Sequence, residues 1–458
     1  MARLTVDTTD TFRKSLTFCF YVSGHGWGHA TRANQIICDI LKLPAQHQVY
    51  VISTASSFIF QGVIELGARY RHADIDAGVV QPLPYTVDRE LTIHNLKQFL
   101  ARRPVTLAAE INWLKQVQAD CVVCDAPFLP CAAAAGANIP AAIASNFTFD
   151  EVYSGLREGD SLDDDIVEML QQVVGDYECA DLLIRLPGAI RIPSFDDTIH
   201  LVPQTPASAT FPGIVNGKPQ LPCVSISNIH NKSRMLRRII DVPLVFRKYK
   251  TEREDVLQAL QIPSEIYSSH KILLLSFGGQ ALGKDGFGES LPPGWICIVC
   301  AAPDYISMPP GFYRAPKDAY VPDLTNAADV VLGKLGYGTC SECVGHGKPF
   351  VYISRPQFIE EQGLLKLMQN QGSAVEMSRE DFEQGRWADA IEAASKLSGR
   401  CSEPERLVGH NGGQVAAKTL EQFVDEWHRL MSAELRILSM DDNTIITPGG
   451  NDRIFLER

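Results

Sequence analysis

Two histidines in a short glycine-rich segment are the residues best suited to acid–base chemistry. The segment 23–29 reads SGHGWGH and joins an apolar strand pattern to a helix pattern. An imidazole titrates near neutral pH, so His25 or His29 can accept a proton from a hydroxyl group in a transition state. Glycines such as Gly28 let a ligand approach the backbone at a helix N-terminus, where N–H groups attract anions. The alternative interpretation is that both histidines only cap the helix.

Asp125 extends this group of residues. It ends the apolar run DCVVCD at 120–125, which predicts a buried parallel strand. The carboxyl ends of such strands meet at the edge of a doubly wound sheet where ligands bind. A carboxylate there can hold one tautomer of a histidine and stabilise the imidazolium. The competing interpretation is an aspartate that caps the following helix.

A second polar cluster lies between residues 333 and 362. Its glycine turn, which precedes a helix pattern, consists of Gly336, Tyr337, Gly338 and Thr339. Backbone N–H groups of this turn, together with the cation of Lys334, form a cradle for a diphosphate. Glu342 can accept two ribose hydroxyl protons, and Glu360, Glu361 and Gln362 suit the hydroxyls of a sugar. A capping box between Thr339 and Glu342 is the structural alternative.

Glycines also follow the strand pattern KILLLSF at 271–277. Residues 278–284 match the start of a P-loop, but Asp285 stands where a Ser or Thr would hold magnesium, so an ATPase is excluded. Phosphate contact by Ser276, Gly278 and Gly279 remains a prediction. The first loop spaces its glycines as G-x-G-x-G, and strand two ends in Ser-Thr rather than an acidic residue, which disfavours a nicotinamide or flavin dehydrogenase.

Strand and helix patterns alternate twice along the chain, which predicts two doubly wound α/β halves. In the first half we expect strands at 16–22, 48–54, 120–125, 140–145 and 181–186, with helices at 30–43, 56–67, 90–118 and 129–137. In the second half we expect strands at 271–277, 295–300, 329–333 and 349–354, with helices at 338–346, 358–371, 379–396 and 413–432. Residues 187–240 are interpreted as an insertion and connector, and 436–458 show no clear pattern.

Composition limits the classes of protein that remain. The 458 residues are enough for two domains, and the net charge of -12 argues against nucleic acid or an anionic membrane as a partner. No apolar run is long enough for a membrane span, and the N-terminus does not resemble a signal peptide, so a cytoplasmic location is expected. The twelve cysteines are then expected to be reduced thiols. Their CxxC spacings fall mostly on strands, so no metal site is predicted.

The second cluster resembles the donor-binding signature of GT-B glycosyltransferases. The turn at 336–339 resembles that family's Gly-aromatic-x-Ser/Thr turn, which contacts the diphosphate of a nucleotide sugar. The resemblance assigns the ribose to Glu342 and the sugar to Glu361 and Gln362. Tyr320 and Val321 resemble the loop whose aromatic and backbone groups hold the uracil, and Lys334 stands where many relatives carry a histidine.

The first cluster resembles the acceptor side of the same family. The segment GHGWGHATR at 24–32 resembles the loop that bears the catalytic histidine, so this role passes to His29, with His25 as the alternative. Asp125 stands where the family keeps the paired aspartate. The segment IDVPLVFR at 240–247 resembles the start of the interdomain linker. The implied fold is GT-B, with two Rossmann-like doubly wound domains facing each other across a cleft.

The sequence resembles one branch of this family more closely than the others. Residues from about 20 to 375 resemble the glycosyltransferase-like N-terminal region of plant L-arabinokinases and its stand-alone microbial relatives. The GHMP kinase domain of those kinases and its phosphate loop have no counterpart here, so kinase activity is not expected. The HCGWNS sequence motif of plant natural-product glycosyltransferases is also absent, so the donor sugar and the acceptor class stay open.

These observations predict an inverting, metal-independent glycosyltransferase that uses a UDP-sugar as co-substrate, a hydroxyl acceptor and no further cofactor. The expected domains are an acceptor-side domain at 1–240, a nucleotide-sugar-binding domain at 241–435 and a C-terminal tail at 436–458. No oligomeric state is predicted. Two alternatives remain: a nucleotide-sugar epimerase or hydrolase on the same fold, and a non-catalytic nucleotide-sugar-binding protein.

Overall fold

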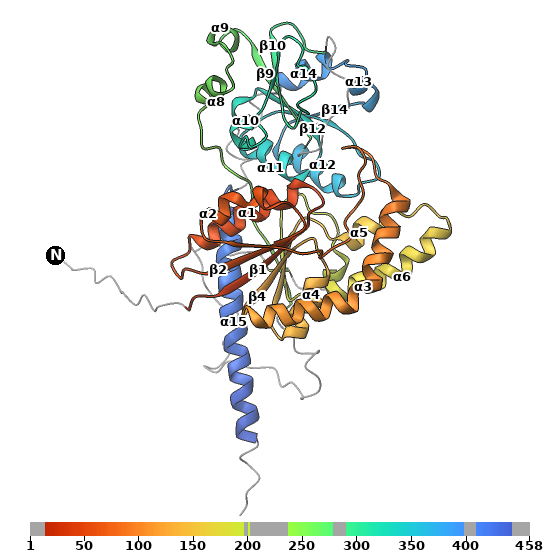
Figure 1. Ribbon diagram of the computed structural model, residues 1–458, viewed down its shortest axis with the longest axis vertical. Helices are drawn as coiled ribbons and strands as arrows, with labels where there is room; N and C mark the ends of the chain where they lie inside the picture. The colour runs from red at the N-terminus through yellow and green to blue at the C-terminus, as the bar shows by residue number, and fades with distance from the viewer. Residues whose placement is uncertain (1–13, 197–199, 202–236, 278–289, 398–408, 442–458) are drawn as a thin grey trace, which may run out of the picture.

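The computed structural model describes residues 14–196, 200–201, 237–277, 290–397 and 409–441. It contains two α/β halves stacked along the long axis of the molecule, each built on its own parallel sheet (Figure 1). The two doubly wound halves predicted from the sequence are therefore confirmed. Gly278 and Gly279, the predicted phosphate contacts, lie outside the described residues.

The first sheet has eight strands in the order β3-β2-β1-β4-β5-β6-β8-β7, and every neighbouring pair is parallel. The strands are β1 Thr17–Val22, β2 Gln48–Ser53, β3 Arg69–His72, β4 Cys121–Asp125, β5 Ala141–Ser145, β6 Leu182–Arg185, β7 His200–Leu201 and β8 Arg238–Asp241. Strands β1 and β4 are buried along their whole length, as expected for central parallel strands. Their register pairs Val22 with Asp125, so the loops after them start side by side.

The helices of the first half cover both faces of this sheet (Figure 1). They are α1 Trp27–Leu41, the 3-10 helix η1 Ser57–Phe60, α2 Gln61–Glu65, α3 Arg89–Gln116, α4 Leu129–Ala137, α5 Phe149–Ser154, α6 Ser161–Tyr177 and the 3-10 helix η2 Pro193–Phe195. Helix α1 begins three residues earlier than the expected start at Ala30, because Gly26 takes a positive φ of 107° that ends the loop. His29 therefore lies in the first helical turn rather than in the loop.

The second sheet has six parallel strands in the order β11-β10-β9-β12-β13-β14. They are β9 Lys271–Ser276, β10 Trp295–Val299, β11 Phe312–Arg314, β12 Val330–Lys334, β13 Phe350–Ile353 and β14 Ala374–Met377. The helices of this half are α8 Arg253–Ala259, α9 Ser264–Tyr267, α10 Val321–Ala327, α11 Tyr337–Gly345, α12 Glu360–Gln371, α13 Arg379–Glu383 and α14 Ala388–Ser395. The single helix expected at 379–396 is two helices, because Gly385 between them has a φ of 71°.

The last helix, α15 Gly412–Asp441, follows the second half in sequence but packs against α1 of the first half. Figure 1 shows it running alongside the first half. Polar contacts to the first half include a hydrogen bond between His47 Nε2 and Glu421 Oε1 at 3.3 Å and an ion pair between Arg238 Nη1 and Glu426 Oε2 at 2.8 Å. The helix extends to Asp441, so the first six residues of 436–458 are helical, where the sequence showed no pattern.

One hydrophobic cluster joins the two halves. It includes Ile36 and Ile40 of α1, Leu420 of α15, Leu335 beside β12, and Leu244 of the connecting segment, which is residues 242–252 between β8 and α8. Each of these side chains is no more than 1% exposed. The connecting segment and α15 thus belong to a shared core rather than to a loose tether. None of the described helices is both long and apolar enough to cross a membrane.

Candidate active site

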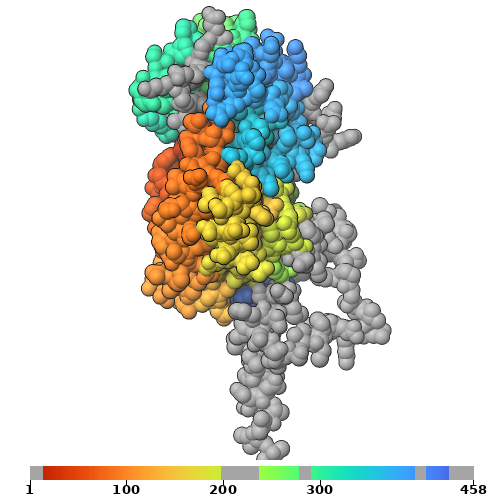
Figure 2. All heavy atoms as spheres, turned by 90° about the vertical axis from the view of Figure 1, so that its right-hand side faces the viewer, coloured from red at the N-terminus to blue at the C-terminus, as the bar shows by residue number. Residues whose placement is uncertain are grey.

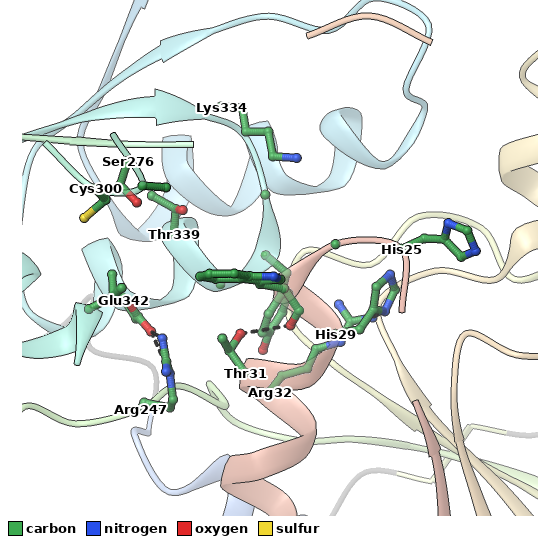
Figure 3. Close-up of a pocket in the computed structure, with 18 of the residues that line it drawn as sticks. His25, His29, Thr31, Arg32, Arg247, Ser276, Cys300, Lys334, Thr339 and Glu342 are labelled. Atoms are coloured by element: carbon green, nitrogen blue, oxygen red, sulfur yellow. Dashed lines mark hydrogen bonds and ion pairs between the residues drawn. The ribbon is translucent and has the colours of Figure 1, made fainter. Parts of the chain in front are cut away.

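A cavity of about 700 Å³ lies between the two halves and receives side chains from both. Figure 2 shows the orange and yellow segments of the first half in contact with the blue segments of the second, and Figure 3 shows side chains from both halves around the cavity. The cavity is lined from the first half by α1 and the loop before it, and from the second half by β12, the turn after it and α11. It therefore lies at the carboxyl ends of both central strands, where doubly wound sheets bind ligands.

The N-terminal turns of α1 and α11 meet in this cavity. A Cβ atom placed on Gly28 would lie 3.8 Å from the backbone N of Gly338, and one placed on Gly338 would lie 3.0 Å from Thr31 Oγ1. Both helices therefore direct N–H groups into the same space, and two helix N-termini together attract an anion. The loop with the histidines and the turn predicted to bind a diphosphate therefore face each other, as expected if both act on one ligand.

His29 and Asp125 form a buried pair on the first-half side. His29 is 7% exposed and Asp125 is 2% exposed, and His29 Nδ1 lies 3.0 Å from Asp125 Oδ1. An ionised carboxylate only accepts hydrogen bonds, so a hydrogen bond to Asp125 uses Nδ1–H as the donor and leaves the lone pair on Nε2, while Arg32 Nη2, also a donor, lies 3.0 Å from the same Nδ1. The pairing expected from the sequence is present in the structure.

Arg32 completes this pair and was not predicted. Its guanidinium donates from Nε to Asp125 Oδ2 at 2.7 Å and from Nη2 to Ser145 Oγ at 2.9 Å, and it is 2% exposed. Burial would raise the pKa of Asp125, but the charge of Arg32 and the neighbouring His29 outweigh it and lower the pKa. A sequence signal existed, because Arg32 lies three residues after His29 on a helix and therefore on a neighbouring face.

His25 makes a separate pair with an aspartate that sequence reasoning missed. Its Nε2 lies 3.2 Å from Asp76 Oδ1, and the ring packs so closely on Gly78 that a Cβ there would lie 1.9 Å from His25 Cδ2. Burial lowers the pKa of His25, but the contact and charge of Asp76 and the charge of Asp74 outweigh it, so the pKa is raised. His25 lines the cavity, with Nε2 directed to Asp76.

The glycine turn of the second half lines the cavity with all four of its residues: Gly336, Tyr337, Gly338 and Thr339. The N-cap of α11 is Gly336, without a side-chain cap hydrogen bond. The capping-box alternative, which needs Thr339 as the N-cap, is therefore wrong. Tyr337 is 2% exposed, and its ring lies 5.1 Å from the guanidinium carbon of Arg32. The turn thus contacts the group that holds Asp125.

Glu342 lines the cavity but already has a partner. Its Oε1 accepts from Arg247 Nε at 3.1 Å and Nη2 at 2.9 Å, as Figure 3 shows. Burial raises the pKa of Glu342, and the charge of Arg247 only partly opposes this. Arg247 comes from the connecting segment after β8 and also lines the cavity. Glu342 thus lines the cavity with a cation at its side that the sequence did not indicate, and its role toward a ribose stays a prediction.

Lys334 extends into the cavity from the end of β12, on the side opposite His29 (Figure 3). Its Nζ lies 3.5 Å from Gln81 Oε1 of the first half. Burial, together with the neighbouring cation of Arg355, lowers the pKa of Lys334 to about 7 despite Glu360 and Glu361 nearby. The pKa is lowered chiefly because burial destabilises the charged ammonium, and a bound anion would stabilise that charge.

The expected contacts of Glu361 and Gln362 with a sugar need correction, because neither lines the cavity. Glu361 accepts from Arg355 N at 2.7 Å and from Arg355 Nε at 2.8 Å, and Gln362 is exposed. The residue that faces the cavity is Glu360, whose Oε1 accepts from Asn146 Nδ2 at 3.2 Å. Successive residues of a helix point about 100° apart, and here Glu360 is turned toward the cavity while Gln362 is turned toward solvent.

Tyr320 also differs from its expected role. It does not line the cavity, whereas Val321 and Ser276 do. Its hydroxyl donates to the carbonyl of Lys248 at 3.1 Å, and Lys250 Nζ lies 4.5 Å from the centre of its ring. In the part of the chain that the structure describes, no group of three or more His, Cys, Asp or Glu side chains is placed to hold a metal ion.

Comparison with known proteins gives a relative and a set of solved structures. The chain is 33% identical over 411 residues to L-arabinokinase of Arabidopsis thaliana, which covers 89% of this chain and 34% of the plant protein. The chain thus spans about a third of the length of that relative. No protein-family model matches the chain.

Three solved structures resemble the whole described fold at low sequence identity. The calicheamicin glycosyltransferase CalG4 is 15% identical, with 90% of this chain and 99% of that chain covered and a TM-score of 0.54. A UDP-glucosyltransferase of Polygonum tinctorium is 13% identical, with 90% and 99% covered and a TM-score of 0.51. S. aureus MnaA, in a structure with UDP, is 11% identical, with 91% and 97% covered and a TM-score of 0.50.

Proposed function

Because the chain has the GT-B glycosyltransferase fold and is a homologue of plant L-arabinokinase, we propose that it transfers a sugar from a UDP-sugar to an acceptor hydroxyl, with inversion and without a metal. The observation that carries the proposal is the meeting of the His29–Asp125 pair and the α11 turn in one cavity. In one cavity, a general base can activate the attacking hydroxyl while an anion site stabilises the leaving diphosphate of the same displacement reaction.

In the proposed reaction His29 acts as the general base. The acceptor oxygen attacks C1 of the sugar, the bond from C1 to the diphosphate oxygen breaks, and the acceptor proton passes to His29 Nε2. Asp125 holds Nδ1–H at 3.0 Å and thereby fixes the tautomer that has its lone pair on Nε2. The shared hydrogen bonds from Arg32 keep the Asp125 carboxylate ionised and in place.

The leaving diphosphate gains negative charge as C1–O breaks, and the second half supplies the opposing charge. The N–H groups at the start of α11 point into the cavity, and Lys334 lines the same wall. Such fixed dipoles and cations stabilise the transition state because they need no reorganisation when charge develops. Glu342 would exchange part of its ion pair with Arg247 for the ribose hydroxyls.

The experiment has a binding step and a turnover step. We expect UDP to raise the melting temperature of the protein more than GDP, TDP or ADP do at equal concentration. UDP-sugars are then incubated with the protein alone and with a panel of hydroxyl acceptors. Donor that stays intact until an acceptor is added supports a transferase. Donor consumed without acceptor would point to the hydrolase or epimerase alternative, and binding without turnover across the panel would point to the non-catalytic alternative.

A further inference from the structure

The aromatic group expected to stack on the nucleobase is not available at Tyr320. That side chain lies outside the lining of the cavity, with Lys250 Nζ 4.5 Å and the Arg247 guanidinium carbon 5.3 Å from its ring centre. Its hydroxyl is held by the carbonyl of Lys248 at 3.1 Å. The ring therefore supports two cations of the connecting segment instead of facing a ligand.

Among the residues of the second half that the structure describes, none at this end of the cavity offers a replacement ring. Beyond Glu342 and Arg247 the wall consists of residues 300–303 and 316–319, with the sequences CAAP and PKDA. Their backbone groups can hydrogen-bond to the edge of a base, but they carry no π-face. Within the part of the chain that the structure describes, a stacking surface for a nucleoside can therefore come only from the opposite wall, which the first half contributes.

Trp27 is on that opposite wall. It is the first residue of α1, lies between Gly26 and Gly28, and lines the cavity. Gly28 is the residue within 4 Å of the Gly338 turn, so the tryptophan side chain begins one residue from the predicted diphosphate site.

The helix places Trp27 on the nucleoside side of the site. Thr31 follows Trp27 by four residues and shares its helix face, whereas His29 and Arg32 face Asp125. In Figure 3 Thr31 lies between the Arg247–Glu342 pair and His29. The face of α1 that carries Trp27 and Thr31 is therefore the one turned to the expected ribose carboxylate.

Phe58 extends this surface. Its ring packs against Trp27 with 5.8 Å between centroids and an interplanar angle of 78°, and both rings line the cavity. Phe58 is 55% exposed, which is unusual for a phenyl group at the edge of a cavity that two domains enclose. Together Trp27 and Phe58 form an aromatic wall opposite the peptide wall of residues 300–303 and 316–319.

We propose that the nucleobase of the donor stacks on Trp27, with Phe58 supporting the indole edge, so that the acceptor-side half contributes directly to nucleotide binding. This inference rests on the proposed function. A base held between an aromatic wall from one half and a peptide wall from the other makes the nucleotide a bridge between the halves. Trp27 is then a determinant of donor affinity, and His29, two residues later on the same helix, is positioned by the same contact.

The test compares UDP with inorganic pyrophosphate, which lacks the nucleoside, by isothermal titration calorimetry. Base–aromatic stacking is worth enough that Trp27→Ala should weaken UDP binding roughly 5- to 150-fold. Pyrophosphate affinity should change by less than about twofold, because the α11 turn and Lys334 are untouched. Trp27→Phe keeps a ring and should retain most of the UDP affinity, which also serves if Trp27→Ala folds poorly. Tyr320→Leu is the matched control and should leave the ratio of UDP to pyrophosphate affinity near the wild-type value.

Each contrary outcome has one meaning. If Trp27→Ala and Trp27→Phe both bind UDP like the wild type, the base does not stack on Trp27 and the inference is wrong, although the proposed function stands. If Trp27→Ala weakens UDP and pyrophosphate equally, the tryptophan shapes the turn instead of stacking, and the inference is also wrong. If Tyr320→Leu alone changes the ratio, the nucleoside depends on Tyr320 or on the Arg247 that its ring supports and not on Trp27, and the inference is wrong. A wild-type protein that binds none of the nucleoside diphosphates would instead overturn the proposed function.

Discussion

At the scale of single residues, the site depends on how charge is shared around Asp125. A buried carboxylate is stable only when its charge is compensated, and Asp125 has both Arg32 and His29 within hydrogen-bond distance. The arginine supplies a permanent cation, which lowers the pKa of Asp125 and keeps the carboxylate ionised beside His29.

We expect His29→Ala to lower turnover by roughly 10²- to 10⁴-fold, the usual contribution of a general base. UDP affinity should stay close to the wild-type value, because the anion site lies on the second half. Turnover is measured with the donor and acceptor pair found active in the acceptor panel. His25→Ala is the control, since His25 lines the same cavity but pairs with Asp76. A larger loss in His25→Ala than in His29→Ala would transfer the role of base to His25.

Lys334 predicts how UDP binding depends on pH. Its pKa in the empty protein is lowered to about 7 by burial and by Arg355, against the opposing charges of Glu360 and Glu361. A bound diphosphate raises this pKa. Below pH 7 the lysine is charged before UDP arrives, so affinity is at its maximum. Above pH 7 binding must take up a proton, so affinity falls by up to about tenfold per pH unit until the pKa of the complex is reached.

Calorimetry between pH 6 and 9, in two buffers with different ionisation enthalpies, measures both the affinity and the proton uptake. Lys334→Arg is the control, because an arginine stays charged throughout this range. The difference between the two proteins removes the contributions of UDP itself and of His25. An affinity that rises with pH, or the same slope in Lys334→Arg, would show that Lys334 is not the group that titrates.

At the scale of elements, the decisive arrangement is the approach of two helix N-termini. Helices α1 and α11 begin at glycine-rich turns that lie within van der Waals distance of each other. Gly338 shows this directly, since a Cβ there would lie 3.0 Å from Thr31 Oγ1 and 3.7 Å from Gly28 Cα. The two turns therefore have to be considered as one anion site built from both halves.

We expect Gly338→Val to weaken UDP binding by more than tenfold while the melting temperature of the free protein changes by only a few degrees. The branched side chain would fill the space between the two turns or push them apart. The matched control is Gly336→Ala, because a Cβ at Gly336 has nothing within 4 Å. Thermal-shift titration with UDP measures both variants. Equal affinity in Gly338→Val and in the wild type would mean that the nucleotide does not use this turn.

At the scale of the whole molecule, the two halves are linked by more than the connecting segment. Asn146 donates to Glu360 Oε1 at 3.2 Å across the boundary, and the Arg32 guanidinium lies 5.1 Å from the Tyr337 ring. Helix α15 returns from the second half and binds the first through His47 and Arg238. The relative position of the halves, and with it the geometry of the cavity, is thus defined by buried polar contacts as well as by the shared hydrophobic core.

A double-mutant cycle with Asn146→Ala and Glu360→Ala tests this link. Because the pair is buried, we expect a coupling free energy of about 0.5–3 kcal/mol in urea unfolding. The control cycle uses Tyr85→Phe and Glu383→Ala, a hydrogen bond of 3.1 Å that also crosses the boundary but is exposed to solvent. Its coupling should be smaller, since water competes for exposed polar groups. A coupling near zero for the buried pair would indicate that this hydrogen bond does not contribute to holding the two halves together.

The sequence by itself determined the architecture and the centre of the site. Continuous apolar runs are typical of buried parallel strands, and helix patterns separate them along the chain. This alternation predicted two doubly wound halves. The rule that ligands bind at the carboxyl ends of such strands then identified the segments of His29, Asp125 and Gly338. Short polar elements escaped this reasoning: β3 has the sequence RYRH, and only pairing with β2 makes it a strand.

The tertiary structure alone decided which polar side chains share a ligand and which satisfy one another. Neither Arg247 nor Arg355 has a recognisable spacing from the carboxylate it binds, so their pairing with Glu342 and Glu361 follows only from packing. Helix phase likewise turned Glu360 toward the cavity and Gln362 toward solvent. Strand and helix patterns are local and can be found along the chain, whereas the compensation of buried charge depends on which distant segments fold together.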